Sequence, residues 1–334
     1  MAINRLAMQQ LGAEPTVIEL ALPYSTLIFL VIPFTVLIQV LSSILQGTGE
    51  TRTPMYAMIV VNLLHILIAY PLIYGRWGAP AMGLKGAAIA VGLAEATGAA
   101  YLMLRCHPIL KPSSKLRFDL IRSIWDVGAP VSGERIVQQA GILIYTKLVL
   151  LYGTVSYAAH QVGLSIESLS FLPGYGFAIA AATMVGQSIG AGKYTRAKLE
   201  NWEANRLATL IMASMGIVFF FFPYVLLRVF TTDEAVIELG TVFLKIVALL
   251  QIPLALTMVL AGSLRGAGDT RFIMGTTMVG MWGVRVPMAL IVALWLHLSV
   301  FYVWSAMIAD WTVRMALLLW RYQSERWRAI QVIR

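Results

Sequence analysis

The sequence contains nine long apolar segments, and they constrain its fold more than any other feature. Each is long enough to cross a bilayer, which takes about 20 residues in a helix. Inside the hydrocarbon layer the backbone must satisfy its own hydrogen bonds, so such segments cross as helices. The segments run over approximately residues 17–46, 53–75, 83–106, 119–152, 154–190, 200–229, 233–264, 271–296 and 298–322. They predict an all-α polytopic membrane protein with nine transmembrane helices.

The composition supports this class. Hydrophobic residues make up 59% of the chain and charged residues 12%, whereas a soluble domain has about 25% charged residues. The net charge of +9 does not indicate nucleic-acid binding, because most Lys and Arg residues fall in short loops on one side of the predicted membrane. Since basic loops stay in the cytoplasm, we expect a cytoplasmic C-terminus. Cys106 is the only cysteine, so an intrachain disulfide is excluded.

A short turn occurs twice in the chain. Residues 45–52 read LQGTGETR and residues 264–271 read LRGAGDTR, an offset of 219 residues, from 45 to 264. The match continues without a gap on either side, and it indicates an internal repeat. The glycines favour a helix that ends in a left-handed conformation, and the acid and Thr that follow favour the start of the next helix. By charge, both turns face the cytoplasm.

The repeat predicts the domain organisation. The first three segments match the last three, so one repeat spans six helices, and the fourth to sixth segments have no counterpart in the chain. We therefore expect the last nine helices of a two-lobe 6+6 repeat, an arrangement found in transporters. The predicted parts are a partial first lobe over 1–106, a cytoplasmic linker over 107–118 and a complete six-helix lobe over 119–334. We expect that the 334 residues alone do not transport.

The chain resembles the multidrug and toxin extrusion (MATE) transporters, on the DinF-like bacterial side of that family. The resemblance rests on the two glycine turns and on four further stretches. These are residues 128–130 (GAP), 158–161 (AAHQ), 171–176 (FLPGYG) and 185–192 (VGQSIGAG). The resemblance implies two six-helix lobes in a bacterial inner membrane, antiport driven by H⁺ or Na⁺, and export of amphipathic, often cationic organic compounds.

Three acidic residues within the apolar segments are candidates for cation coupling, because charges at membrane depth are costly and usually functional. Glu134 follows Pro130 by four residues, and the resemblance implies an acid with a coupling role in this helix, although members usually carry it where this chain has Gln138. A local ion pair with Arg135 is the structural alternative. Glu167 lies in a serine-rich run that could bind its carboxyl. Asp310 precedes Arg314 by four residues, a spacing that favours a salt bridge within one helix.

Six residues are candidates for the substrate cavity. In the last six segments they are Tyr145, Gln161, Tyr175 and Gln187, which could offer aromatic and polar surface to a cationic compound or simply pack between helices. In the first three segments they are Glu95 and His65. Many family members carry an Asn and an Asp four residues apart in the second segment, where this chain has His65 and Ala69.

Other functions lack their motifs. No His or Cys spacing indicates a metal site, no phosphate-binding loop indicates ATP, and no nucleophile with a partnered base indicates an enzyme. We therefore expect no cofactor besides the coupling ion, and a small organic molecule and the lipid bilayer as partners, with the oligomeric state undecided. Two alternatives stay open: a flippase for lipid-linked glycans, which would favour a basic cavity, and a truncated fragment that does not transport.

Overall fold

The computed structural model describes residue 5, residues 15–108 and residues 118–330. The chain divides into two compact units, Met1–Leu116 and Arg117–Arg334. The division falls inside the predicted linker over 107–118, most of which lies outside the described residues, as do most of the residues before α2 and the last four of the C-terminus. Each unit is described by itself below.

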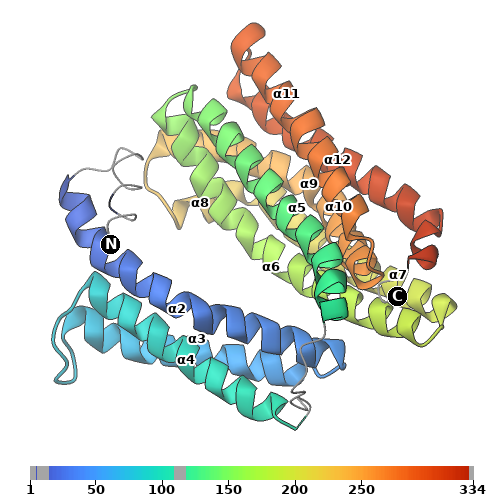
Figure 1. Ribbon diagram of the computed structural model, residues 1–334. Helices are drawn as coiled ribbons and strands as arrows, with labels where there is room; N and C mark the ends of the chain where they lie inside the picture. Colours follow the sequence, from blue (N-terminus) through green and yellow to red (C-terminus); the bar gives the residue numbers. More distant parts are fainter. Residues whose placement is uncertain (1–4, 6–14, 109–117, 331–334) are drawn as a thin grey trace. The chain divides into compact units, whose positions relative to one another are not determined.

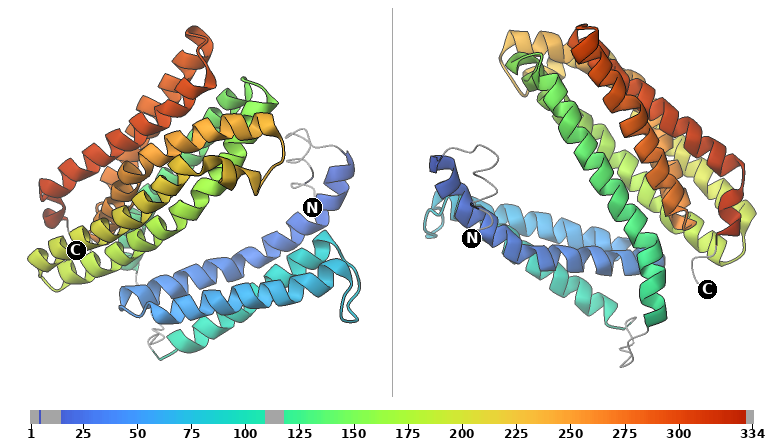
Figure 2. Two further views of the ribbon diagram at one scale, coloured as in Figure 1. Left: turned by 180° about the vertical axis from the view of Figure 1, so that it is seen from behind. Right: turned by 45° about the horizontal axis from the view of Figure 1, so that its top comes forward.

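The first unit consists of three long helices, α2 (Pro15–Gly47), α3 (Arg52–Tyr74) and α4 (Leu84–Cys106). They lie side by side in Figures 1 and 2, and α4 packs against both of the others. Small residues allow this approach: a Cβ added to Gly98 would lie 2.3 Å from Val61 Cγ2. Close contact through glycine is the usual way in which membrane helices associate.

The second unit is a bundle of long helices with shorter segments at their ends. The long helices are α5 (Phe118–Leu150), α6 (Thr154–Gly190), α7 (Tyr194–Phe221), α9 (Glu234–Gly266) and α12 (Val300–Gln323). The sequence predicts one helix over 200–229, but α7 ends at Phe221 and α8 (Pro223–Arg228) follows it. The reason is Pro223, which has no N–H to continue the ladder of hydrogen bonds. A 3-10 turn, η3 (Arg326–Ala329), follows α12.

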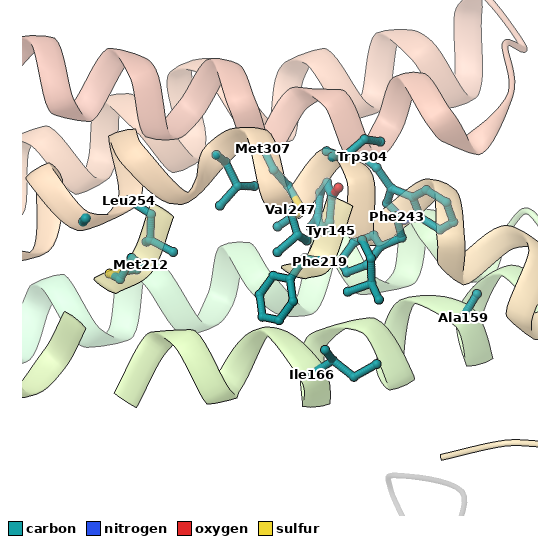
Figure 3. Packing of buried hydrophobic residues seen from close by; sticks show 14 of the residues in the cluster. Tyr145, Ala159, Ile166, Met212, Phe219, Phe243, Val247, Leu254, Trp304 and Met307 are labelled. Carbon is teal, nitrogen blue, oxygen red and sulfur yellow. The ribbon is translucent and has the colours of Figure 1, made fainter. Parts of the chain in front are cut away.

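α9 lies at the centre of the second unit, where it packs against α6, α7 and α12. Its glycines bring it close to α6, since a Cβ added to Gly262 or Gly266 would lie 2.2 Å from the carbonyl oxygen of Ala178 or Ala182. The core beside it is aromatic. Figure 3 shows the side chains of Tyr145, Phe243, Trp304 and Met307 gathered between the helices.

The prediction of one continuous helix over 271–296 is incomplete. α10 (Thr270–Met278) passes into the π-helical η1 (Val279–Arg285), then α11 (Val286–Leu290) and the π-helical η2 (Ile291–Trp295). Pro287 cannot donate a backbone hydrogen bond to the preceding turn, which favours a local departure from α-helix. π-helical turns are uncommon and often occur at functional sites.

Within the described part of the chain, seven helical stretches are long and apolar enough to cross a membrane. They are Ala21–Gly47, Arg52–Tyr74, Leu84–Cys106, Thr154–Gly190, Tyr194–Phe221, Glu234–Gly266 and Thr270–Trp295. α5 and α12, over the predicted spans 119–152 and 298–322, are not among them, and they carry the charged residues Glu134 and Asp310. The protein is therefore an all-α, multi-pass membrane protein, and nine spans remain a prediction.

Candidate functional site

Two neighbouring cavities lie within the second unit. We call the first the Glu134 cavity; its volume is about 90 Å³. We call the second the Arg285 cavity; its volume is about 410 Å³. Gln138, Phe171 and Trp311 line both, so the two cavities share a wall. Every residue that lines either cavity belongs to the second unit.

Glu134 is buried at the Glu134 cavity and paired with an arginine from a distant helix. Arg265 Nη2 donates to both of its carboxylate oxygens, at 2.7 and 2.8 Å, and Thr277 Oγ1 lies 3.4 Å from Oε1. Arg135, the local partner considered from the sequence, is exposed at the same cavity. Arg265 belongs to the second glycine turn, so the repeated turn supplies the partner of the candidate coupling acid.

Asp310 lies at the centre of a buried ion cluster. The i to i+4 pair predicted from the sequence is present: Arg314 Nε donates to Asp310 Oδ1 at 2.5 Å, and Arg314 Nη2 donates to Oδ2 at 3.1 Å. A second guanidinium joins from η1, because Arg285 Nε lies 2.7 Å from Oδ2. Gly280 makes room for the cluster, since a Cβ there would lie 2.2 Å from Asp310 Oδ1. The Asp310 carboxylate is thus the counter-ion of two buried arginines.

Aromatic rings surround the arginines of this cluster. The Arg285 guanidinium lies 5.6 Å from the ring centre of Tyr145 and 5.8 Å from that of Trp311, and Arg314 lies 5.0 Å from the ring of Trp311. Such contacts favour a cation in an apolar site. The Tyr145 hydroxyl donates to the Val303 carbonyl at 3.0 Å, so its ring is held in place against Arg285.

Glu167 and His160 line the Arg285 cavity with Tyr145. Both are buried, and Glu167 interacts electrostatically with Arg285. The hydroxyls of Ser165, Ser168 and Ser170 donate to backbone carbonyls rather than to the Glu167 carboxylate. The His160 ring lies edge-on to Tyr145 and Phe243. The cavity therefore presents one acidic, one basic and one imidazole group within an aromatic wall.

The predicted cavity residues on α6 lie in two places. Tyr175 lines the Glu134 cavity. Gln161 and Gln187 are exposed on α6, and neither is among the described residues that line the two cavities. Gln161 Nε2 donates to the Tyr157 hydroxyl at 3.4 Å.

Glu95 and His65 belong to the first unit. Glu95, half-buried on α4, shares a hydrogen bond with Thr35 of α2 and interacts electrostatically with His65 of α3. The three helices of this unit therefore meet at a small polar cluster. The sequence shows no local partner for Glu95, because both partners come from other helices.

Sequence reasoning missed Arg285, Arg265 and Gly280 as parts of the site. The sequence does indicate that Arg285 is unusual, because this charged residue lies within an apolar segment, two residues before Pro287. No local pattern links Arg265 to Glu134, which lies on another helix 131 residues earlier in the chain. No group of three or more His, Cys, Asp or Glu residues that could hold a metal ion occurs among the residues described.

Comparison with known protein families and sequences gives a consistent picture. A family model described as MatE matches residues 1–71 and 130–291. The chain is 34% identical over 302 residues to the probable multidrug resistance protein NorM of Thermotoga maritima; the match covers 88% of this chain and 64% of the relative. It is 25% identical over 336 residues to the probable multidrug resistance protein YoeA of Bacillus subtilis, covering 98% and 72% of the two chains. The chain thus spans less than two thirds of the Thermotoga relative.

Solved structures share the fold. A MOP superfamily transporter from Pyrococcus furiosus, for which a reverse polarity of the binding pocket suggests a different function, superimposes with a TM-score of 0.89 at 18% identity, over 99% of this chain and 75% of that one. A MATE protein in complex with MaL6 superimposes with a TM-score of 0.87 at 19% identity, over 98% and 75%. At these identities the likeness establishes the fold alone.

Proposed function

Because the chain belongs to the MATE family of membrane transporters, which are not enzymes, we propose that it carries out secondary active efflux of amphipathic organic compounds, including cationic ones, driven by H⁺ or Na⁺. The names of its relatives support this proposal. The chain spans 64% of the Thermotoga relative, and we propose for it the activity of a whole transporter. We also propose that it belongs to the DinF-like subtype, that it has nine transmembrane spans, and that it lies in a bacterial inner membrane with its C-terminus in the cytoplasm.

The observation that carries the proposal is the pairing of Glu134 with Arg265. A buried carboxylate needs a positive partner, and at the Glu134 cavity that partner could be Arg265, a proton, a Na⁺ ion or a cationic substrate. These partners compete for the one negative charge of the Glu134 carboxylate. Binding of the driving ion at Glu134 would therefore displace both Arg265 and the substrate, which is the exchange that antiport requires.

The other candidate acids take different roles in this proposal. Glu167 faces the Arg285 cavity and could hold a second cation or the cationic part of a substrate, with Tyr145 beside it. Asp310 is fully buried between two arginines, so its charge is already compensated, and we assign it to the framework of the cavity. Tyr175 adds aromatic surface near Glu134.

An export assay tests the proposal. The chain is expressed in a bacterium that lacks its own multidrug exporters, and the efflux of ethidium is followed after the ion gradient is restored. If the chain transports by itself, export should depend on the gradient and should fall at least about tenfold in Glu134→Gln, the range of a lost charged contact. Glu238→Gln, the same change at an exposed glutamate on α9, serves as the matched control. Export that survives Glu134→Gln would remove Glu134 from the mechanism.

The same assay decides between export and the non-transporting alternative. Only 17% of an 18-residue apolar stretch of α2 is buried, whereas 61% of such a stretch of α9 is, and a transporter must cover its polar cavity faces. If the 334 residues alone export nothing while expression is normal, transport requires additional helices from the same or another polypeptide.

A specific observation also favours the flippase alternative. Arg135, Arg265 and Arg314 line the Glu134 cavity and Arg285 lines the other, although the sequence places most basic residues in loops. A basic cavity suits the phosphates of a lipid-linked glycan. Movement of such a lipid, with no ethidium export from the same membranes, would support this alternative.

A further inference from the structure

Arg285 is a buried cation with two guanidinium nitrogens that make no hydrogen bond to the described residues. Its side chain is 8% exposed and lines the Arg285 cavity. Although its Nε lies 2.7 Å from Asp310 Oδ2, the angle does not make a hydrogen bond, and neither Nε nor Nη2 has a hydrogen-bond partner among the described residues. A guanidinium carries five N–H donors in a planar fork, and leaving such donors unpaired in a buried place is costly.

The charges around Arg285 leave it undercompensated. Arg314 donates hydrogen bonds to both oxygens of Asp310, so the Asp310 carboxylate is shared between two guanidinium groups. Glu167 lies in the same cavity and interacts with Arg285, but no ion pair within 4 Å joins them in the described structure. The wall of this cavity includes three aromatic residues, Tyr145, Trp311 and Phe171.

We propose that Arg285 is a subsite for the anionic group of an amphipathic substrate, a carboxylate or another oxyanion, whose aromatic body lies against Trp311, Tyr145 and Phe171. A carboxylate matches the fork of a guanidinium and would accept the hydrogen bonds that Arg285 does not make. The cavity of about 410 Å³ has room for a drug-sized ring system. This inference rests on the proposed export of organic compounds and narrows their class.

Glu167 limits which anions the subsite accepts. Its carboxylate repels a second anion in the same cavity, so a compound that also carries a positive group is favoured over one that is purely anionic. Glu167→Gln removes the repulsion and should therefore strengthen the binding of an anion, whereas Arg285→Gln should weaken it. The two substitutions thus have opposite expected signs in a single cavity.

The test measures binding by isothermal titration calorimetry, without transport. The purified 334-residue chain in phosphatidylcholine nanodiscs is titrated with three probes that share one ring system: the anion 1-naphthaleneacetate, the neutral 1-naphthaleneethanol and the cation 1-naphthylethylammonium. We expect the anion to bind more tightly than the neutral probe. Arg285→Gln should lower the affinity for the anion about tenfold, the value of one charged hydrogen bond. The affinity for the neutral probe should change by no more than about twofold. Arg285→Lys should fall in between.

Arg206→Gln, the same change at an exposed arginine on α7 that lines neither cavity, should leave all three affinities unchanged. Retained binding of 1-naphthaleneethanol shows that a variant is folded. An anion that binds no better than the neutral probe, or an equal loss of all three probes in Arg285→Gln, would overturn the proposal. If Arg285→Gln does not fold, the relative affinities of the three probes for the unchanged protein and for Arg285→Lys still test the proposal.

Two further arms separate the possible outcomes. If added phosphatidylglycerol competes with 1-naphthaleneacetate, the natural anion is a lipid head group. If phosphatidylglycerol does not compete, the natural anion is a soluble compound. Ethidium export is scored separately, so anion binding without export would support the non-transporting alternative and leave the Arg285 subsite standing. Export without anion binding would contradict the Arg285 subsite alone.

Discussion

α2 and α9 are copies of one helix in two different settings. Both are 33 residues long, both end in the repeated glycine turn, and both turns contain a left-handed glycine, Gly49 with φ +90° and Gly268 with φ +84°. Yet 61% of an 18-residue apolar stretch of α9 is buried, and only 17% of such a stretch of α2. Within their own units, α9 packs against α6, α7 and α12, and α2 packs against α3 and α4.

The two turns also differ in what their side chains contact. In the first turn, the Glu50 carboxylate accepts hydrogen bonds from the backbone N–H groups of Arg52 and Thr53 and so caps α3. In the second turn, Asp269 at the equivalent position accepts a hydrogen bond from Arg321 of α12. The repeated residues therefore set the backbone of the turn, and the residues that differ connect the second copy to the rest of its bundle.

Each unit also carries an acid on the third long helix of its repeat, although the two acids are 215 positions apart, from 95 to 310, and so do not share the offset of the turns. Glu95 lies in the sequence AEAT of α4 and Asp310 in ADWT of α12, the third long helix of each repeat. Each acid faces a basic residue of the preceding helix, His65 in one unit and Arg285 in the other. Glu95 is half-buried and Asp310 is fully buried, so we expect the second cluster to contribute far more to stability.

Asp310→Asn tests this difference and has the largest expected effect. Removing the carboxylate charge leaves Arg285 and Arg314 buried without a counter-ion, which should lower the free energy of unfolding by about 3–5 kcal/mol. The matched change in the first unit, Glu95→Gln, should cost about 1 kcal/mol or less, because its site is partly exposed. Unfolding in SDS-containing micelles measures both. Equal effects would show that burial does not distinguish the two clusters.

Gly280→Ala has an intermediate expected effect. The new Cβ would lie 2.2 Å from Asp310 Oδ1 and 2.4 Å from Arg314 Nε, so the ion cluster must shift. We expect a loss of about 1–3 kcal/mol in the free energy of unfolding. Gly275→Ala, on the neighbouring α10, places its Cβ in open space and should be neutral or slightly stabilising. A stable Gly280→Ala protein would mean that the cluster is not tightly packed.

Arg265→Gln gives the second turn the residue that the first turn carries at position 46, and its effect on stability is the smallest. The Arg265 side chain is 31% exposed and Thr277 Oγ1 also donates to Glu134, so water and Thr277 replace part of the lost contact and we expect a loss of about 1 kcal/mol. The converse change, Gln46→Arg, should have no measurable effect. If both substitutions behave alike in the same unfolding assay, the Glu134 pair does not distinguish the two copies.

The positions of the helices could be predicted from the sequence, and most contacts between them could not. The lengths of the apolar segments and the positions of glycine and proline predicted the ends of helices such as α2 and α6 to within about two residues. These signals are local in the sequence. The Asp310–Arg314 pair could also be predicted, since four residues are about one helical turn. The pairing of Glu134 with Arg265 and the approach of Arg285 to Asp310 could not, because each joins two helices whose packing no local pattern specifies.

The most direct test of the central claim, that Glu134 exchanges its partner between the driving ion and a cationic substrate, is a competition experiment. The affinity of the purified chain for ethidium is measured while the H⁺ or the Na⁺ concentration is varied. If one ion competes at Glu134, mass action predicts that ethidium affinity falls about tenfold for each tenfold rise in that ion once the ion is saturating. In Glu134→Gln this dependence should disappear. A dependence of the same slope in Glu134→Gln and in the unchanged protein would contradict the claim.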